Sequence, residues 1–447
     1  MRVSANGRYL ENDDGTPFFY LADTAWRLLY QTPEDAECYL LNRKEKGFTV
    51  VQPCCIFEVY RGRDGLLKNS AGEVPFLDDT LREPNPKFFA HVDTIIDKAA
   101  QLGLTVALLP TWGAYVIDAK WAPGTIFFNT ETARAYGRFI GARYKDKPIV
   151  WVIGGDRCPR TDEHIAIWRA LAEGIRECDG GGHPMTYHPS TRPYLSSSHW
   201  FHNEDWLDFN MMQTSTRWWD TYNYVLHDYN LEPVKPVVDG ETRYEHSHRD
   251  FGKKTGPRMT ARHVRQAAYN AMLSGALGHT YGCRDVWSFH VPGDEEPSRD
   301  VDTHWREAMD FLGAFHMGHM RTLFTDYPWH MLVPDQKHEL VTRQTITHGN
   351  LMREDIDGVM SGANTESMSH IPAARARDGS FAVVYTPVQQ RFAVDLSGFD
   401  GAPVKARWFD PRTGRYADAG EHAGGEIEFT PPRDEDPDCA LVLARTA

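Results

Sequence analysis

Two carboxylic acids follow apolar runs directly, and as a pair they could do chemistry. Asp156 follows IVWVIGG and Glu241 follows PVVDG, with Glu245 as the next acid along the chain. An unpaired buried carboxylate is costly, so such an acid caps a helix, pairs with an arginine or takes part in a reaction. Arg157 and Arg243 keep the ion-pair interpretation open for each acid alone. Together, two acids flanked by Trp and Tyr suit cleavage of a glycosidic bond, because one carboxyl must hold a proton while the other is ionised.

Polar and aromatic residues at the ends of other apolar runs could bind a sugar. Aromatic rings offer apolar faces to sugar C–H groups, while Asp, His and Gln bind hydroxyl groups. Each residue also has a purely structural interpretation, such as a helix cap for Asp23, a satisfied core position for His188 or a backbone hydrogen bond for Gln213. The candidates for substrate binding are Asp23, Trp26, Trp112, His188, Trp200, Gln213 and Tyr281.

The elements that must position these residues are eight apolar runs separated by helical patterns. The runs are nearly continuously apolar, which is typical of parallel strands buried on both faces. They cover residues 18–26, 48–57, 105–113, 149–156, 185–190, 209–216, 236–241 and 275–282. Helices are predicted at residues 33–47, 86–103, 130–146, 162–179 and 258–275.

Eight such alternations predict a (β/α)₈ TIM barrel, whose active face is the carboxyl end of the strands. Asp156 then follows the fourth strand and Glu241 the seventh, so the two acids face each other across one mouth. Segments 58–85 and 191–208 are long enough to wall the site, and the first holds Arg61 and Arg63. An open doubly wound sheet is the alternative, but the sequence has neither G-x-G-x-x-G after its first strand nor a P-loop.

The pattern changes near residue 345 to short strand-like runs separated by turn signals. These include SFAVVYTP, the hairpin signal DPRTG and a final CALVLA, while 355–369 resembles a loop. The sequence therefore predicts a catalytic barrel over residues 1–345 and a small antiparallel β-sandwich over 346–447. The simplest role for the sandwich is to cover part of the barrel surface.

Composition excludes several classes of function. The 447 residues carry a net charge of −14, which argues against nucleic acid as a partner. No apolar run is long enough to span a membrane, and no signal peptide is visible, so we expect no membrane partner and a cytoplasmic location. The seven cysteines are odd in number and show no C-x-x-C spacing, which also favours a reducing compartment.

Two other classes of function stay open. A metal-dependent barrel enzyme would need a ligand cluster, but His246-x-His248 is isolated and HExxH is absent. A carbohydrate-binding protein without catalysis would use the aromatic residues alone. We expect neither a metal nor another cofactor, and a small glycoside or oligosaccharide as the binding partner.

Several motifs resemble the apiosidase-like glycoside hydrolases. The run GRYLENDDGTPFFYLADTAWRLL is similar to the start of that family, and VIGGDR and VVDGETRYE resemble its two catalytic segments. WFDPRTGRY, FTPP and the terminal LVL resemble the β-sandwich that often follows, commonly labelled a collagen-binding domain. The resemblance implies that Asp156 is the general acid/base and Glu241 the nucleophile.

The resemblance further implies a retaining exo-glycosidase that acts on a terminal pentofuranoside such as a β-apioside. An arabinofuranosidase or another glycosidase with a barrel fold remains the alternative. Gly155-Asp156 also departs from the Asn-Glu pair that is common after the fourth strand of related barrels. A shorter Asp must be brought closer to the substrate.

Overall fold

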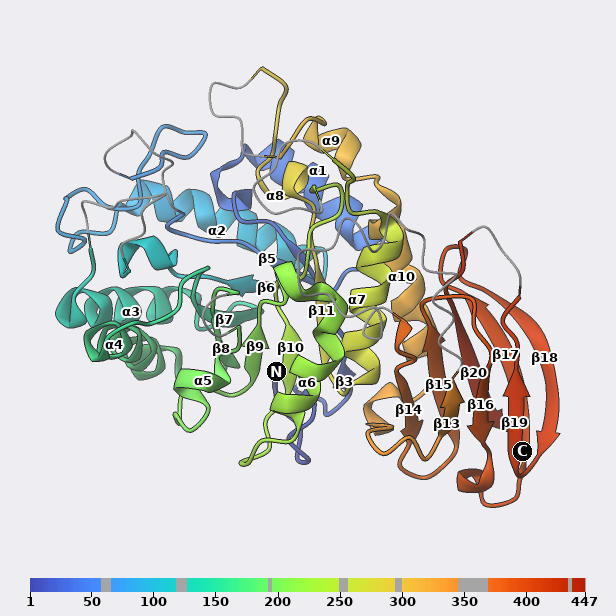
Figure 1. Ribbon diagram of the computed structural model, residues 1–447. Coiled ribbons are helices and arrows are strands. Elements are labelled where there is room, and N and C mark those ends of the chain that lie inside the picture. The colour runs from blue at the N-terminus through green and yellow to red at the C-terminus, as the bar shows by residue number, and fades with distance from the viewer. Residues whose placement is uncertain are drawn as a thin grey trace.

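The computed structural model describes residues 1–57, 66–117, 127–191, 195–248, 256–293, 300–344, 369–432 and 436–446. Its larger part is an eight-stranded parallel sheet with the strand order β8-β7-β6-β5-β4-β11-β10-β9 (Figure 1). The strands are β4 (Tyr20–Thr24), β5 (Val50–Gln52), β6 (Thr105–Leu108), β7 (Ile149–Gly154), β8 (Met185–His188), β9 (Asn210–Met212), β10 (Val237–Asp239) and β11 (Gly278–Tyr281). Each predicted apolar run holds one strand of this sheet.

The two end strands of this sheet lie side by side and nearly close it. The backbone N–H of Asp208 donates to the carbonyl of Met185 at 2.8 Å, and the Thr186 hydroxyl donates to the carbonyl of Phe209 at 2.6 Å. The predicted TIM barrel is therefore confirmed, with β7 as its fourth strand and β10 as its seventh.

Helices surround the barrel, and their ends carry the expected signals. Thr32 and Asn85 cap the first two long helices, and a proline follows each cap in the first turn. The helices are α1 (Pro33–Glu45), α2 (Pro86–Gln101), α3 (Thr130–Tyr144), α4 (Asp162–Asp179), α5 (Ser198–Phe201), α6 (Thr221–Tyr229), α7 (Ala261–Leu273), α8 (Arg284–Trp287), α9 (Trp305–Ala308) and α10 (Leu312–Thr325). A small antiparallel sheet of β1 (Arg2–Val3), β2 (Leu10–Glu11) and β3 (Pro17–Phe18) precedes them. None of the described helices is long and apolar enough to cross a lipid bilayer.

The C-terminal part consists of two antiparallel sheets that pack face to face. The larger has the order β12-β14-β15-β20-β17-β18 and the smaller β13-β16-β19. Their strands are β12 (Leu332–Pro334), β13 (Val341–Gln344), β14 (Ala373–Ala376), β15 (Phe381–Thr386), β16 (Phe392–Asp395), β17 (Pro403–Asp410), β18 (Arg415–Ala423), β19 (Glu426–Phe429) and β20 (Cys439–Arg445). Because β12 and β13 pair into these sheets, the sandwich takes its first strands from residues before the division expected at 345.

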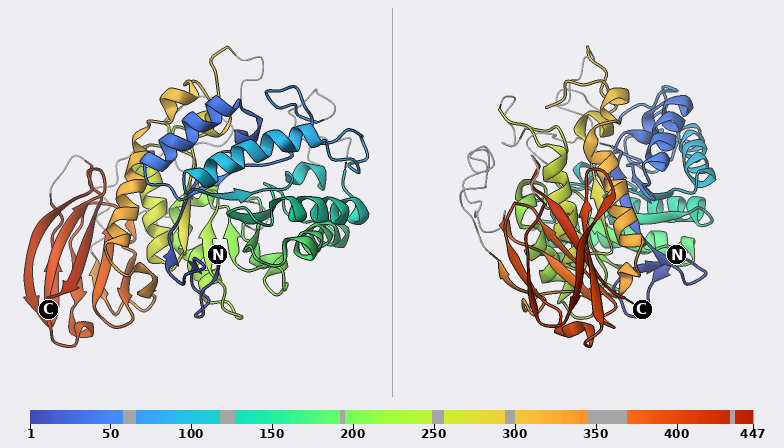
Figure 2. Two further views of the ribbon diagram at one scale, coloured as in Figure 1. Left: turned by 180° about the vertical axis from the view of Figure 1, so that it is seen from behind. Right: turned by 90° about the vertical axis from the view of Figure 1, so that its right-hand side faces the viewer.

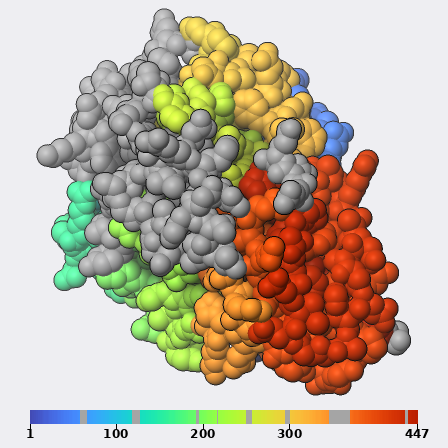
Figure 3. Space-filling view, turned by 45° about the vertical axis from the view of Figure 1, so that its right-hand side comes forward, coloured from blue at the N-terminus to red at the C-terminus, as the bar shows by residue number. Residues whose placement is uncertain are grey.

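The larger sheet of the sandwich also packs on the barrel helices α7 and α10 (Figure 2). Figure 3 shows the red sandwich directly beside the orange part of the barrel. Along β15, Ala382 and Val384 face the sandwich core, whereas Val383 and Tyr385 belong to the core shared with the barrel. The ring of Tyr385 stacks on that of Tyr269 from α7, with centroids 4.4 Å apart. The two parts of the chain therefore share one continuous apolar core.

A buried ion pair crosses the same interface. Arg265 of α7 contacts both carboxylate oxygens of Asp438, through Nε at 2.9 Å and Nη2 at 2.6 Å. Nη2 also lies 2.6 Å from Asp436, and the Tyr385 hydroxyl donates to Asp438 at 2.8 Å. Both Arg265 and Asp438 are almost fully buried.

Replacing Arg265 with Met is expected to destabilise the protein by about 3–5 kcal/mol, because Asp438 would remain buried without its partner. Chemical or thermal unfolding followed by circular dichroism measures this change. The matched control is Arg82→Met, which removes the exposed pair with Glu131 and should cost about 1 kcal/mol or less. An equal loss in the free energy of unfolding for the two substitutions would show that the buried interface pair stabilises the protein no more than an exposed pair does.

Candidate active site

The chain turns sharply inward where β7 ends. Gly154, Gly155 and Asp156 all have positive φ, at 88°, 143° and 48°. The backbone N–H of Gly155 donates to the carbonyl of His188 at 3.0 Å, and the Gly155 carbonyl accepts from Gly113 at 3.0 Å. A Cβ atom on Gly155 would lie 2.8 Å from the ring of Trp112, so no side chain fits there. This turn brings the short side chain of Asp156 into the mouth of the barrel.

Asp156 lies among charged and polar groups that act on its proton. Its Oδ2 is 3.3 Å from Nη1 of Arg157, and its carboxylate forms a hydrogen bond with Gln213. Burial raises the pKa of Asp156, and the negative charge of Glu241 raises it further. Arg157 and Gln213 oppose this rise without cancelling it. Asp156 is therefore suited to hold a proton, and its side chain is still 30% exposed.

Glu241 follows β10 and is more enclosed, with 10% of its side chain exposed. Two groups contact its carboxylate: the hydroxyl of Tyr244, which forms a hydrogen bond, and Nε2 of His188, which lies 3.2 Å from Oε2. Tyr244 is fixed in turn by the indole N–H of Trp26, which donates to its hydroxyl at 3.1 Å. These contacts orient Glu241 toward the mouth that it shares with Asp156.

Aromatic rings crowd around this pair of acids. The rings of Trp26 and Trp112 meet edge to face at 4.9 Å, and Phe57 meets Trp112 at the same distance. Trp287 lies 5.9 Å from Phe57. The indole N–H groups of Trp112 and Trp287 are buried and have no hydrogen-bond partner among the described residues. Such donors are available to a bound polar ligand.

Of the predicted residues, Trp26, Trp112, His188 and Gln213 lie next to the two acids. Asp23 is the first correction: the sequence predicted that it binds the sugar, but the structure places its side chain away from the two acids. Its side chain is fully buried, accepts a hydrogen bond from Tyr39 at 2.6 Å and pairs with Arg43 at 2.8 Å. Both partners belong to α1, so Asp23 points out of the barrel toward the helices.

Tyr281 is the second correction. It pairs in register with Asp23 and therefore points in the same outward direction. Its hydroxyl donates to Oε2 of Glu245 at 2.5 Å, and the other oxygen of Glu245 accepts from the backbone N–H of Gly313. Glu245, the alternative acid, is thus engaged in a structural contact between the barrel and α10.

Trp200 lies on the short helix α5, where its ring contacts those of Tyr187 and His199. Neither neighbour is one of the catalytic candidates. The loop residues Arg61 and Arg63 lie outside the described part of the chain, as does most of the predicted loop 355–369.

The structure adds Gln52 and Phe57 to the site. Gln52 ends β5 and reaches across the barrel, where its side-chain amide donates to the carbonyl of Gly240 at 3.0 Å. Its Oε1 atom is buried without a partner among the described residues. The only amide side chain inside the run FTVVQPCCIF was the signal, because a polar side chain in a buried strand needs a polar neighbour or a ligand.

Asp239 holds the backbone just before Glu241. Its carboxylate accepts from the Thr214 hydroxyl at 2.6 Å and from the backbone N–H of Glu241. Burial raises the pKa of Asp239 to about 7. Asp239 therefore anchors the carboxyl end of β10 to the loop after β9.

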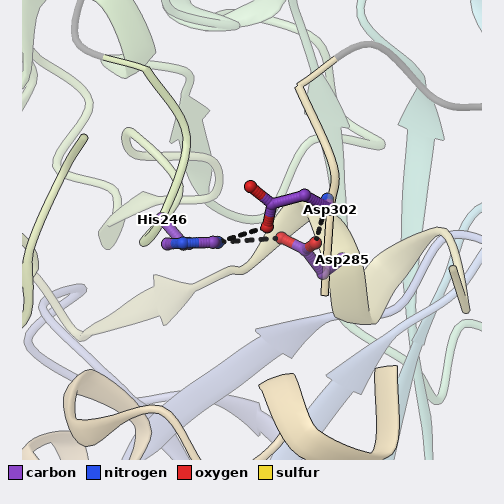
Figure 4. Close-up of side chains that lie close together, drawn as sticks. All are labelled: His246, Asp285 and Asp302. Atoms are coloured by element: carbon purple, nitrogen blue, oxygen red, sulfur yellow. Dashed lines mark hydrogen bonds and ion pairs between the residues drawn. The ribbon is translucent and has the colours of Figure 1, made fainter. Parts of the chain in front are cut away.

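The histidines considered as metal ligands lie in a group of ion pairs beyond β10. His246, Asp285 and Asp302 come from three separate segments (Figure 4), with His246 Nδ1 3.5 Å from Asp285 and 3.6 Å from Asp302. Asp302 is also bound by Arg258 at 2.6 Å, and one oxygen of Asp285 accepts two backbone N–H groups. A nearby guanidinium and occupied lone pairs suit an ion-pair contact between these segments better than a cation site.

We expect full activity after exhaustive dialysis against EDTA, because a reaction carried by the carboxyls of Asp156 and Glu241 does not use this group. Hydrolysis of an activated glycoside before and after dialysis, with and without added divalent cations, provides the measurement. Loss of activity that Zn²⁺ or Ca²⁺ restores would contradict this expectation and turn attention to His246 and its neighbours.

Comparison with known sequences gives two family matches. Residues 4–331 match the model described as "Apiosidase-like, catalytic domain", and residues 357–444 match "Putative collagen-binding domain of a collagenase". No curated protein matched the sequence.

Solved structures resemble the whole chain. A protein described as a glycoside hydrolase is 30% identical, with a TM-score of 0.84 over 100% of this chain and 96% of its own. A glycoside hydrolase family 5 protein from Bacteroides vulgatus is 28% identical, with a TM-score of 0.83 over 99% of this chain and 93% of its own. A family 5 mannosidase from Rhizomucor miehei, 12% identical with a TM-score of 0.54 over 73% of this chain and 97% of its own, shares the fold alone.

Proposed function

Because this chain belongs to the apiosidase-like family and is a glycoside hydrolase, we propose that it removes a terminal pentofuranosyl residue, such as β-apiose, with retention of configuration. One observation carries the proposal: His188 contacts both Asp156 and Glu241, so the two acids share one barrel mouth, where burial and Glu241 raise the pKa of Asp156. Two unequal carboxyls are what acid-assisted displacement at an anomeric carbon needs.

In the proposed first step, Glu241 attacks the anomeric carbon while Asp156 gives its proton to the leaving oxygen. The aglycone departs as an alcohol, and the sugar stays bound to Glu241 as an ester. In the second step Asp156, now a carboxylate, takes a proton from water, and the resulting hydroxide displaces Glu241. The free sugar leaves with its original anomeric configuration.

The surroundings of the two acids support action on a small terminal sugar. Glu241 is nearly enclosed, and its neighbour His188 is flanked by the rings of Trp26 and Trp112. Phe57 packs on Trp112. In this proposal Gln52, Trp112 and Gln213 offer polar atoms to sugar hydroxyls, while ring faces exclude water. An arabinofuranoside satisfies the same chemistry and is the second glycone to test.

The substrate and the stereochemistry can be tested together. A panel of 4-nitrophenyl furanosides and pyranosides, including the β-apioside and the α-arabinofuranoside, is assayed for release of nitrophenol. We expect furanosides to be cleaved and pyranosides to be poor substrates. Proton NMR of the first-formed sugar should show retention, consistent with carboxyls about 5–5.5 Å apart. Inversion would overturn the mechanism, and pyranoside preference would overturn the substrate class.

We also propose that the C-terminal sandwich acts as a structural support for the barrel. One face of its larger sheet is occupied by α7 and α10, and Arg265 and Tyr269 join the two parts. Collagen binding, which the name of the second family model describes for other proteins, is tested by a pull-down on collagen beads. We expect no retention of the protein.

A further inference from the structure

His188 ends β8 and lies between the two acids. Its side chain is fully buried. One ring nitrogen, Nδ1, accepts from the backbone N–H of Asp156 at 3.3 Å, and the other, Nε2, lies 3.2 Å from Oε2 of Glu241. A single imidazole therefore contacts the main chain of one acid and the carboxylate of the other.

These contacts assign the proton on the ring. A backbone N–H can only donate, so Nδ1 must present its lone pair to Asp156. A neutral imidazole carries one N–H, which then sits on Nε2 and faces Glu241. In the opposite tautomer, the Nδ1–H group would face the backbone N–H of Asp156, and the lone pair on Nε2 would face the carboxylate of Glu241. Both contacts would be repulsive.

The ring is held from several sides. The rings of Trp26 and Trp112 lie 5.4 Å and 6.3 Å from it, and the His188 carbonyl accepts from Gly155 at 3.0 Å. The Nε2–H group does not point straight at Glu241, and neither atom has a well-aligned hydrogen bond among the described residues. Catalytic hydrogen bonds in free enzymes are often misaligned in this way and tighten when substrate binds.

We propose that His188 is a positioning residue that links Asp156 to Glu241, holding the backbone of the first through Nδ1 and orienting the second through Nε2–H. This inference rests on the proposed roles of the two acids. It replaces direct sugar binding, which the sequence suggested for His188, because both ring nitrogens already face groups of Asp156 and Glu241.

The proposed contact has a chemical advantage for the nucleophile. A neutral donor stabilises the carboxylate of Glu241 without cancelling its charge, whereas an imidazolium would pair with it and weaken its attack. Other ionisable groups near Glu241 are Asp156 from β7, Asp239 from its own strand, and Arg243 and Tyr244 just after it.

Two substitutions separate the two halves of this link. The amide oxygen of Asn lies as many bonds from Cα as Nδ1, so His188→Asn retains an acceptor for Asp156 and loses the donor to Glu241. The amide nitrogen of Gln corresponds to Nε2, so His188→Gln retains the donor and loses the acceptor. The matched control is His279→Asn, which alters another fully buried barrel histidine, on β11.

The pH profile of kcat/KM and its dependence on the leaving group are the readouts. For His188→Asn we expect the acid limb, which reports ionisation of the nucleophile, to move up by about one pH unit. Rates should fall by a similar factor for all leaving groups. For His188→Gln we expect the acid limb to stay, and glycosides of poor leaving groups to lose about tenfold more rate than the 4-nitrophenyl glycoside. His279→Asn should change neither readout.

A direct measurement needs no substrate. Two-dimensional ¹⁵N NMR of histidine-labelled protein at neutral pH, with His188→Gln used to assign the signal, should show the Nε2–H tautomer. An Nδ1–H tautomer or an imidazolium would overturn the inference.

One kinetic outcome would overturn the inference. If both His188 variants raise KM and bind the free sugar more weakly, while the acid and basic limbs of the kcat/KM profile stay in place, His188 is a sugar ligand. If wild-type protein cleaves no glycoside, the proposed function fails, while the NMR result still decides the state of His188.

Discussion

Glu241→Gln is expected to lower kcat on a 4-nitrophenyl glycoside by on the order of 10⁴-fold. The substitution preserves the shape of the side chain and removes the negative charge that attacks the anomeric carbon. Tyr244 and His188 can still contact an amide oxygen, so the fold should be retained, as circular dichroism would verify. Steady-state kinetics measure the loss, with extreme care taken to exclude contaminating wild-type enzyme.

Added azide provides a sharper form of the same experiment. Glu241→Ala leaves a gap where the carboxylate stood, and a small anion can occupy that gap and attack the sugar in place of Glu241. We expect partial recovery of turnover and a glycosyl azide of inverted configuration. Glu245→Gln is the matched control, because Glu245 contacts Tyr281 and Gly313 and should affect stability instead of the chemical step. Wild-type rates for Glu241→Gln would refute the nucleophile assignment.

Asp156→Asn is expected to lower kcat/KM by about 10³-fold on glycosides whose leaving groups need a proton. The 4-nitrophenyl glycoside should lose much less in the first step, because 4-nitrophenolate leaves without protonation. The ester between the sugar and Glu241 should then accumulate, because no base remains to activate water. A burst of nitrophenol followed by a slow steady rate would reveal this accumulation.

The pH dependence gives the same assignment an independent check. A general acid must be protonated, so activity is present below its pKa and is lost as the pH rises through it. Because burial and Glu241 raise the pKa of Asp156, the basic limb of wild-type kcat/KM should lie above the ordinary range of an aspartic acid. That limb should vanish in Asp156→Asn and remain in Asp162→Asn, an exposed acid at the start of α4. A basic limb retained in Asp156→Asn would assign the acid elsewhere.

The barrel was predictable because buried parallel strands are nearly all apolar and the acids interrupt that pattern at strand ends. Asp156 and Glu241 both stand where the chain leaves an apolar run. The direction of side chains was not predictable from the same runs. Side chains alternate along a strand, but a continuous apolar run does not show which positions face inward.

The predictions for Asp23 and Tyr281 were both wrong because the apolar runs do not show which positions face the inside of the barrel. Their outward direction is set by Arg43 on α1 and by Glu245 after β10, contacts that only the folded chain brings together. Gln52 was not predicted as a site residue, because a Gln within an apolar run does not by itself show whether it contacts the backbone or a ligand. The ring of Trp112 lies so close to Gly155 that no side chain fits there, and no local sequence pattern shows this contact.

The apolar core shared by α7 and the sandwich restricts how this protein could have changed over time. Tyr269 and Arg265 are helix residues whose neighbours, Tyr385 and Asp438, lie more than a hundred positions later in the chain. A sandwich exchanged for an unrelated one would leave an arginine and an aromatic ring without partners. Barrel and sandwich are therefore expected to be inherited as one unit, with compensating changes across the contact.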